Sequence, residues 1–199
     1  MKKQFLLITA AMLLSIASAF AQGGTTGPLT WNINNGTLTI SGEGEMPDYY
    51  ADQPWYDYKD DIYTLVIESG VVSIGYSAFE YFDNLTSVTI SNTVLSINSY
   101  AFSGCEKLPS IVFSDGLKSI AFMAFVECSA LTSVFLSKSV TIIDPTSFAA
   151  CYSLTSIEVD SENKANSFFL VLRKIFGSAK EEEFDVSGSV ISGDEPLQF

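Results

Sequence analysis

The sequence predicts an α/β solenoid, in which coils of chain stack to form a parallel β-sheet on one side and turns or short helices on the other. Three observations support this fold class. A pattern of apolar residues repeats every 23 residues, without insertions, between residues 68 and 159. Each repeat ends in alternating apolar and polar residues, as expected for a strand with one buried face. A segment with the pattern of a β-hairpin precedes the first repeat and predicts an N-terminal cap.

Residues 1–21 have the features of a secretory signal peptide. The pair Lys2-Lys3 precedes an apolar run, and Ala19-Phe20-Ala21 supplies the small-x-small cleavage pattern. The mature chain is then expected to begin at Gln22 and to be extracellular or held at the cell surface. The run is short for a bilayer span, which makes a retained membrane anchor the weaker alternative.

The charge balance restricts the partners of the chain. The net charge is −13, and removal of Lys2 and Lys3 leaves 8 basic against 23 acidic residues, a net charge of −15. A surface this negative repels phosphate groups, so nucleic acids and anionic membranes are excluded as expected partners. Basic proteins, cations and neutral sugars remain compatible with it.

Residues 22–67 are predicted to form the N-terminal cap. The stretch WNINNGTLTI has the apolar alternation of a hairpin, with Asn35-Gly36 as its turn. The following residues, 49–63, are rich in tyrosine and aspartate and include Trp55 and Tyr56. We expect these aromatic side chains to cover the first coil. The alternative is a sugar site or a calcium site, although the D-x-D-x-D-G spacing of a calcium loop is missing.

Residues 68–160 contain four repeats, at 68–90, 91–113, 114–136 and 137–159, and each ends in the L-x-x-L-x-L phrase of leucine-rich repeats. The fold class is therefore an α/β leucine-rich-repeat solenoid. One column of equivalent positions contains Phe79, Phe102, Phe125 and Phe148. Because a buried phenylalanine removes a large apolar area from water, we expect this column to contribute most to stability.

The three cysteines occupy a single column, at Cys105, Cys128 and Cys151, where the first repeat has Phe82. A position that accepts phenylalanine is apolar, and a free cysteine behaves as a small hydrophobic residue. We therefore expect buried thiols that fill the core. A disulfide between neighbouring coils is an alternative, whereas a zinc site or a nucleophile would need further ligands or a base in a chain without histidine.

Residues 161–199 depart from the repeat and are predicted to form a C-terminal cap followed by a loose tail. The dense apolar run SFFLVLRKIF favours a cap over the last coil. A surface anchor, a partner segment or a shortened gene product are the alternatives. Ten residues are too few to span a bilayer.

The repeats resemble the BspA-type leucine-rich repeats of bacterial surface proteins. The stretch GVVSIGYSAFEYFDNLTSVTI and its successors follow the pattern V-x-x-I-x-x-x-A-F-x-x-C-x-x-L-x-x-V-x-I, and the similarity extends over about residues 31–160. The resemblance implies a secreted or surface protein that adheres to host matrix or plasma proteins, such as fibronectin and fibrinogen. It does not imply an enzyme or a cofactor.

The outward positions of the predicted strands are the candidate binding residues, because stacked coils align single residues into columns. Val112 and Phe135 stand where polar residues are expected. Two neighbouring exposed apolar side chains can form the centre of a protein contact. The alternative is that they are isolated surface hydrophobic residues, which are common in folded proteins. The candidates for protein binding are Thr86, Thr89, Val112, Thr132, Phe135 and Glu158, and those for glycan binding are Trp55 and Tyr56.

Catalytic motifs are missing from the sequence, which has no G-x-S-x-G, no phosphate-binding glycine loop and no histidine for acid–base chemistry. We therefore predict an exported, non-enzymatic protein without a metal or cofactor, which takes part in adhesion or protein–protein interaction. The alternatives are a glycan-binding module and a structural surface protein without a ligand of its own.

Overall fold

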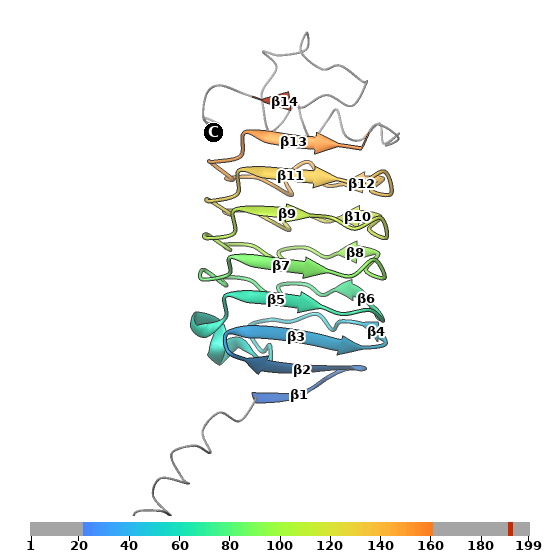
Figure 1. Cartoon of the computed structure of the whole chain (residues 1–199), viewed down its shortest axis with the longest axis vertical. Coiled ribbons are helices and arrows are strands. Elements are labelled where there is room, and N and C mark those ends of the chain that lie inside the picture. Colours follow the sequence, from blue (N-terminus) through green and yellow to red (C-terminus); the bar gives the residue numbers. More distant parts are fainter. Residues whose placement is uncertain (1–21, 161–190, 193–199) are drawn as a thin grey trace, which may run out of the picture.

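The computed structural model describes residues 22–160 and 191–192. The chain winds into coils that stack along one axis, and each coil contributes a strand to a front sheet and most contribute a short strand to a back sheet (Figure 1). The predicted solenoid with its parallel sheet is confirmed. Within the described residues, the chain forms no helix with the length and apolar character needed to cross a lipid bilayer.

The front sheet contains the strands that end each repeat. Strands β5 (Thr64–Ile67) and β7 (Ser87–Ile90) pair in parallel, as do β9 (Ser110–Val112), β11 (Ser133–Leu136) and β13 (Ser156–Val159). Ser133 pairs with both Ser110 and Ser156, so equivalent residues of successive repeats lie side by side. This register confirms the 23-residue period. A two-residue strand, β14 (Ile191–Ser192), pairs antiparallel with β13.

The back sheet is parallel and runs along the opposite side of the stack. Its strands are β4 (Gly44–Glu45), β6 (Val71–Ile74), β8 (Ser96–Ile97), β10 (Ser119–Ile120) and β12 (Ile142–Ile143). Turns connect it to the front sheet, and Tyr100, Met123 and Glu127 in these turns have positive φ angles. The sequence predicted turns or short helices on this side. The structure has the turns, and it adds a second sheet of short strands that the sequence did not predict.

The N-terminal end is a hairpin, as predicted. Strands β1 (Gln22–Thr26), β2 (Leu29–Asn34) and β3 (Thr37–Gly42) are antiparallel, and Asn35 and Gly36 both have positive φ angles at the tight turn. β3 then pairs in parallel with β5. The parallel ladder therefore already includes two strands that precede residue 68. A 3₁₀ helix, η1 (Tyr56–Asp61), lies between β4 and β5.

The core is a single apolar column between the two sheets. Phenylalanine rings of successive coils stack with centroid separations of 5.4 Å for Phe79–Phe102, 5.1 Å for Phe102–Phe125 and 5.3 Å for Phe125–Phe148. Trp55 extends the stack at its N-terminal end, 5.6 Å from Phe79. All of these side chains are fully buried.

Candidate interaction surface

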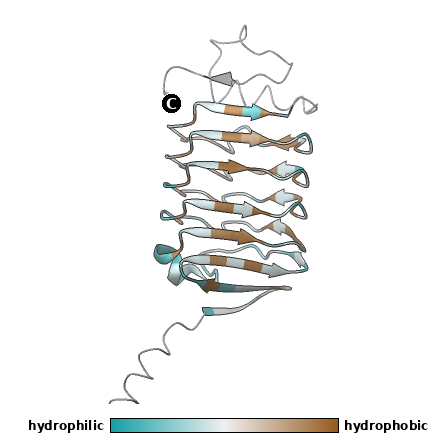
Figure 2. Cartoon of the chain, viewed as in Figure 1, coloured by the Kyte–Doolittle hydropathy of each residue, from teal (hydrophilic) through white to brown (hydrophobic). Residues whose placement is uncertain are grey.

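The outward face of the front sheet brings three of the predicted binding residues together. Phe135 on β11 pairs in register with Val112 on β9 and with Glu158 on β13. Val112 is 66% exposed, Glu158 is exposed and Phe135 is half-buried. Figure 2 shows this change from hydrophobic β9 and β11 to the hydrophilic end of β13. Thr89 is also exposed, on β7, where it pairs with Val66 of β5.

Two predicted binding residues, Thr86 and Thr132, are exposed but have a structural role. The Oγ1 of Thr86 donates a hydrogen bond to the carbonyl oxygen of Tyr63, 3.0 Å away, and that of Thr132 donates to the carbonyl of Pro109, also at 3.0 Å. Thr155 repeats the contact with the carbonyl of Thr132 at 3.3 Å. These hydroxyl groups join successive coils, so their protons are not free for a ligand.

Trp55 does not lie on the surface. Its ring is fully buried against Phe79, and its Nε1 donates a hydrogen bond to the carbonyl of Ala78 at 2.9 Å. This position agrees with the expected cap over the first coil. The alternative, in which this indole stacks on a surface sugar, is wrong because the hydrophobic effect and a main-chain partner hold the ring in the core. Tyr56, its predicted partner, is half-buried, with Lys59 Nζ 5.8 Å from its ring centroid.

The sequence did not predict a second row of aromatic rings, which lies outside the core. Tyr50 stacks on Tyr76 at 5.2 Å, Tyr76 meets Tyr100 edge to face at 5.7 Å, and Tyr100 meets Phe122 at 5.5 Å. Tyr50 is 77% exposed. The sequence does contain an aromatic residue every 22 to 26 positions here. Because these spacings differ from the regular period of 23, the residues do not align in one column of the repeat.

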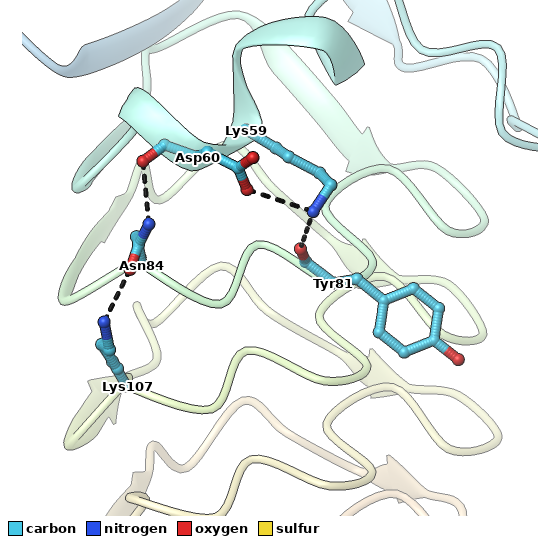
Figure 3. A network of polar contacts seen from close by, with 5 residues as sticks. All are labelled: Lys59, Asp60, Tyr81, Asn84 and Lys107. Atoms are coloured by element: carbon cyan, nitrogen blue, oxygen red, sulfur yellow. Dashed lines mark hydrogen bonds and ion pairs between the residues drawn. The ribbon is translucent and has the colours of Figure 1, made fainter.

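A polar network crosses the turns that lead into the front sheet (Figure 3). Asn84 Nδ2 donates to the carbonyl of Asp60 at 2.8 Å, and Lys107 Nζ donates to Asn84 Oδ1 at 2.7 Å. Lys59 Nζ lies 3.3 Å from Asp60 Oδ1 and 3.4 Å from the carbonyl oxygen of Tyr81. The network thus links three successive coils. Across residues 22–160, no three His, Cys, Asp or Glu side chains group in a way that could hold a metal ion.

The cysteines are free and fully buried in one column, as predicted. Each Sγ donates to the carbonyl oxygen of a phenylalanine in the preceding coil, at 3.4 Å for Cys105, 3.2 Å for Cys128 and 3.1 Å for Cys151. Burial raises the pKa of the Cys105 thiol. A hydrogen bond with the Cys151 side chain, together with burial, raises the pKa of Cys128 well above its ordinary value. Cys105 and Cys128 therefore lack the thiolate character of nucleophilic cysteines.

We expect iodoacetamide to alkylate the three thiols of the folded chain at least about a thousandfold more slowly than those of the unfolded chain, since reaction requires opening of the core. Mass spectrometry of the chain with and without denaturant measures this ratio. Labelling of Cys105 in the folded chain at the rate of a free thiol would contradict the burial of the column.

Comparison with known proteins agrees with this architecture. A family model described as "BspA type Leucine rich repeat region (6 copies)" matches residues 53–169. The chain is similar to the crystal structure of a leucine-rich repeat protein from Eubacterium ventriosum ATCC 27560, with 30% sequence identity and a TM-score of 0.56, over 72% of this chain and 45% of that chain. It is also similar to the leucine-rich repeat protein TpLRR of T. pallidum, with 25% identity and a TM-score of 0.51, over 70% of this chain and 69% of that chain. The search of curated proteins found no match.

Proposed function

Because the chain belongs to the family of BspA-type leucine-rich-repeat proteins, we propose that it is an exported, non-enzymatic protein that binds an extracellular protein through the outward face of its front sheet. The observation that carries the proposal is the pair Val112 and Phe135, which are in-register neighbours on adjacent strands and replace the polar residues expected there. An exposed apolar side chain beside a half-buried one on the outward side of a sheet favours a protein contact. Export would depend on residues 1–21, which lie outside the described residues.

Binding of the mature chain, residues 22–199, to immobilised fibronectin and fibrinogen tests this function. Replacement of Val112 or Phe135 by serine is expected to weaken binding about tenfold or more, because each would remove an apolar side chain buried by the partner. Surface plasmon resonance measures the change, and thermal unfolding checks that the variants stay folded.

The matched control is Ile142→Ser, which changes a side chain of similar exposure, 64%, on the back sheet. This variant is expected to bind like the wild type. Equal affinity of the wild type, Val112→Ser and Phe135→Ser for both proteins would contradict the proposed site. A loss confined to Ile142→Ser would move the site to the back sheet.

A glycan-binding role is the second candidate, and the exposed ring of Tyr50 favours it. Aromatic rings with one free face bind sugars, and a neutral glycan is compatible with the acidic chain. A glycan array probed with the mature chain and with Tyr50→Ala separates this candidate from protein binding, since only the sugar hypothesis expects a signal that Tyr50→Ala removes.

A further inference from the structure

The front sheet is interrupted between β7 and β9. Every other pair of successive coils in this sheet is joined by a ladder, but β7 ends one sheet and β9 begins the next. In the part of the chain that the structure describes, no main-chain hydrogen bond joins residues 86–90 to residues 109–113. The back sheet continues past this point, since β8 pairs with both β6 and β10. The coils therefore remain stacked although one of their two sheets is open.

Pro109 explains the interruption. Pro109 occupies the position equivalent to Thr86 and Thr132 in the neighbouring repeats. The amide of each threonine donates a hydrogen bond to the carbonyl of the equivalent residue in the preceding coil, Thr86 to Tyr63 and Thr132 to Pro109, both at 2.9 Å. Proline has no N–H group, so the equivalent bond from Pro109 to the carbonyl of Thr86 cannot form. On this side of the stack, Lys107 Nζ reaches Asn84 across the same gap (Figure 3).

A second main-chain hydrogen bond between the coils is missing at the other end of β7 and β9. The amide of Ser91 donates to the carbonyl of Ile67 at 3.0 Å, and that of Asp160 donates to the carbonyl of Leu136 at 2.9 Å. The corresponding bond from Ser114 to Ile90 is not formed, and the Oγ of Ser114 instead donates to the carbonyl of Ser91 at 3.2 Å. The interruption thus extends over the whole length of the strands.

The interruption exposes part of the core. Val88 and Ile90 on β7 are only half-buried. The inward residues at the same positions of the neighbouring strands are all buried, namely Leu65, Ile67, Ile111, Phe113, Val134 and Leu136. Val112, on the other side of the interruption, is 66% exposed. Partly exposed inward side chains of β7 and an outward, exposed valine of β9 therefore lie on the two sides of the interruption.

Acidic residues lie at both ends of the interruption between β7 and β9. Asp83 and Glu106 precede β7 and β9, and Asp115 follows β9, and all three are exposed. Lys107 is the basic residue among them, and its ammonium group is bonded to Asn84. An apolar centre flanked by carboxylates is complementary to an apolar side chain flanked by basic residues.

We propose that the interruption at Pro109 is the anchor of the protein-binding face, and that it takes a large apolar side chain from a partner segment with flanking lysine or arginine residues. The proposal rests on the proposed function, since it specifies which part of the front sheet the partner contacts and what that partner presents. The apolar side chain contacts Val88, Ile90 and Val112, and the basic residues face Asp83, Glu106 and Asp115.

The test uses an array of 12-residue peptides with a central Leu, Phe or Trp flanked by either lysines or glutamates. The wild-type mature chain is expected to bind the lysine-flanked peptides and not the glutamate-flanked ones. Pro109→Thr restores the donor of the Thr86 column and is expected to close the ladder. It should slow hydrogen exchange of the amides of residues 110–112 at least about fivefold and weaken peptide binding about tenfold or more.

Pro145→Thr is the matched control, because it replaces a proline outside the front sheet, and it is expected to change neither measurement. Ile90→Ser is a second variant that removes apolar surface from the anchor without closing the ladder, and it should also weaken peptide binding. Unchanged exchange in Pro109→Thr, or slower exchange with unchanged peptide binding, overturns the proposal, as does a wild type that binds no peptide or prefers glutamate flanks. The front-sheet function itself survives these results if Phe135→Ser still loses fibronectin or fibrinogen binding.

Discussion

Replacement of Phe125 by alanine is expected to lower the free energy of unfolding by about 3–5 kcal/mol. The ring is fully buried and stacks between Phe102 and Phe148, with Phe113 at its edge at 5.6 Å. The coils that carry Phe102, Phe125 and Phe148 are joined by ladders in both sheets, so the neighbouring rings cannot move together to fill the space. The substitution therefore removes apolar contacts and leaves a cavity. Denaturant unfolding of the mature chain measures the loss.

Phe122→Ala is the control for this prediction. Phe122 lies in the same repeat but is 41% exposed and contacts only the edge of Tyr100 among the aromatic rings. Its replacement is expected to cost less than about 1 kcal/mol, as surface substitutions usually do. Phe102→Ala should resemble Phe125→Ala, because it occupies the same column. Equal unfolding midpoints for the wild type and both column variants would refute the stacking of the repeats.

The register of the solenoid could be predicted because one pattern recurs four times. Each 23-residue repeat places the same residue types at the same positions, so the alignment of Phe102 with Phe125 or of Cys105 with Cys128 follows from the sequence spacing alone. In-register pairing of Ser110 with Ser133 in the structure has the same origin. Stacked coils leave few other arrangements that bury every apolar column at once.

The back sheet could not be predicted in the same way. Strands such as β8 and β10 contain two residues each, which is too short for the alternation that identifies a strand. Pro109 was visible in the threonine column, but its effect required knowledge of which amides bond to the preceding coil. For Trp55 the sequence favoured a cap over the first coil, and the ring is buried against Phe79, but composition alone left a ligand contact open as the alternative.

The candidate binding residues fall into two groups, those whose side chains bond within the protein and those that remain available, and only the structure separates the two. Alternation in β9 places Val112 on the outward side, whereas Thr86 and Thr132 stand just before β7 and β11; all three are exposed. Only the structure reveals that the two threonine hydroxyls bond to the preceding coil, whereas Val112 has no such role. Sequence patterns thus identify the face, and the hydrogen-bond partners determine which of its side chains remain available.

Replacement of Trp55 by alanine is expected to lower the free energy of unfolding by about 3–5 kcal/mol. Trp55 is fully buried, and its ring meets Tyr49 at 5.4 Å, Phe79 at 5.6 Å and Trp31 at 6.2 Å. It therefore joins the hairpin end of the molecule to the first ring of the phenylalanine column. Its loss leaves a cavity and removes the hydrogen bond to the carbonyl of Ala78.

Two further variants separate these contributions. Trp55→Phe keeps most of the apolar volume but lacks the Nε1 donor, so it is expected to cost about 1–3 kcal/mol, the typical penalty for a buried carbonyl left without its partner. Tyr50→Ala, which truncates an aromatic ring that is 77% exposed in the same segment, should leave stability within about 0.5 kcal/mol of the wild type. A Trp55→Ala variant with wild-type stability but without glycan binding would contradict the structural role, because that combination requires an indole in contact with solvent and ligand. Because Trp55 is a buried cap residue, we expect Trp55→Ala to lose stability and to leave any glycan binding unchanged.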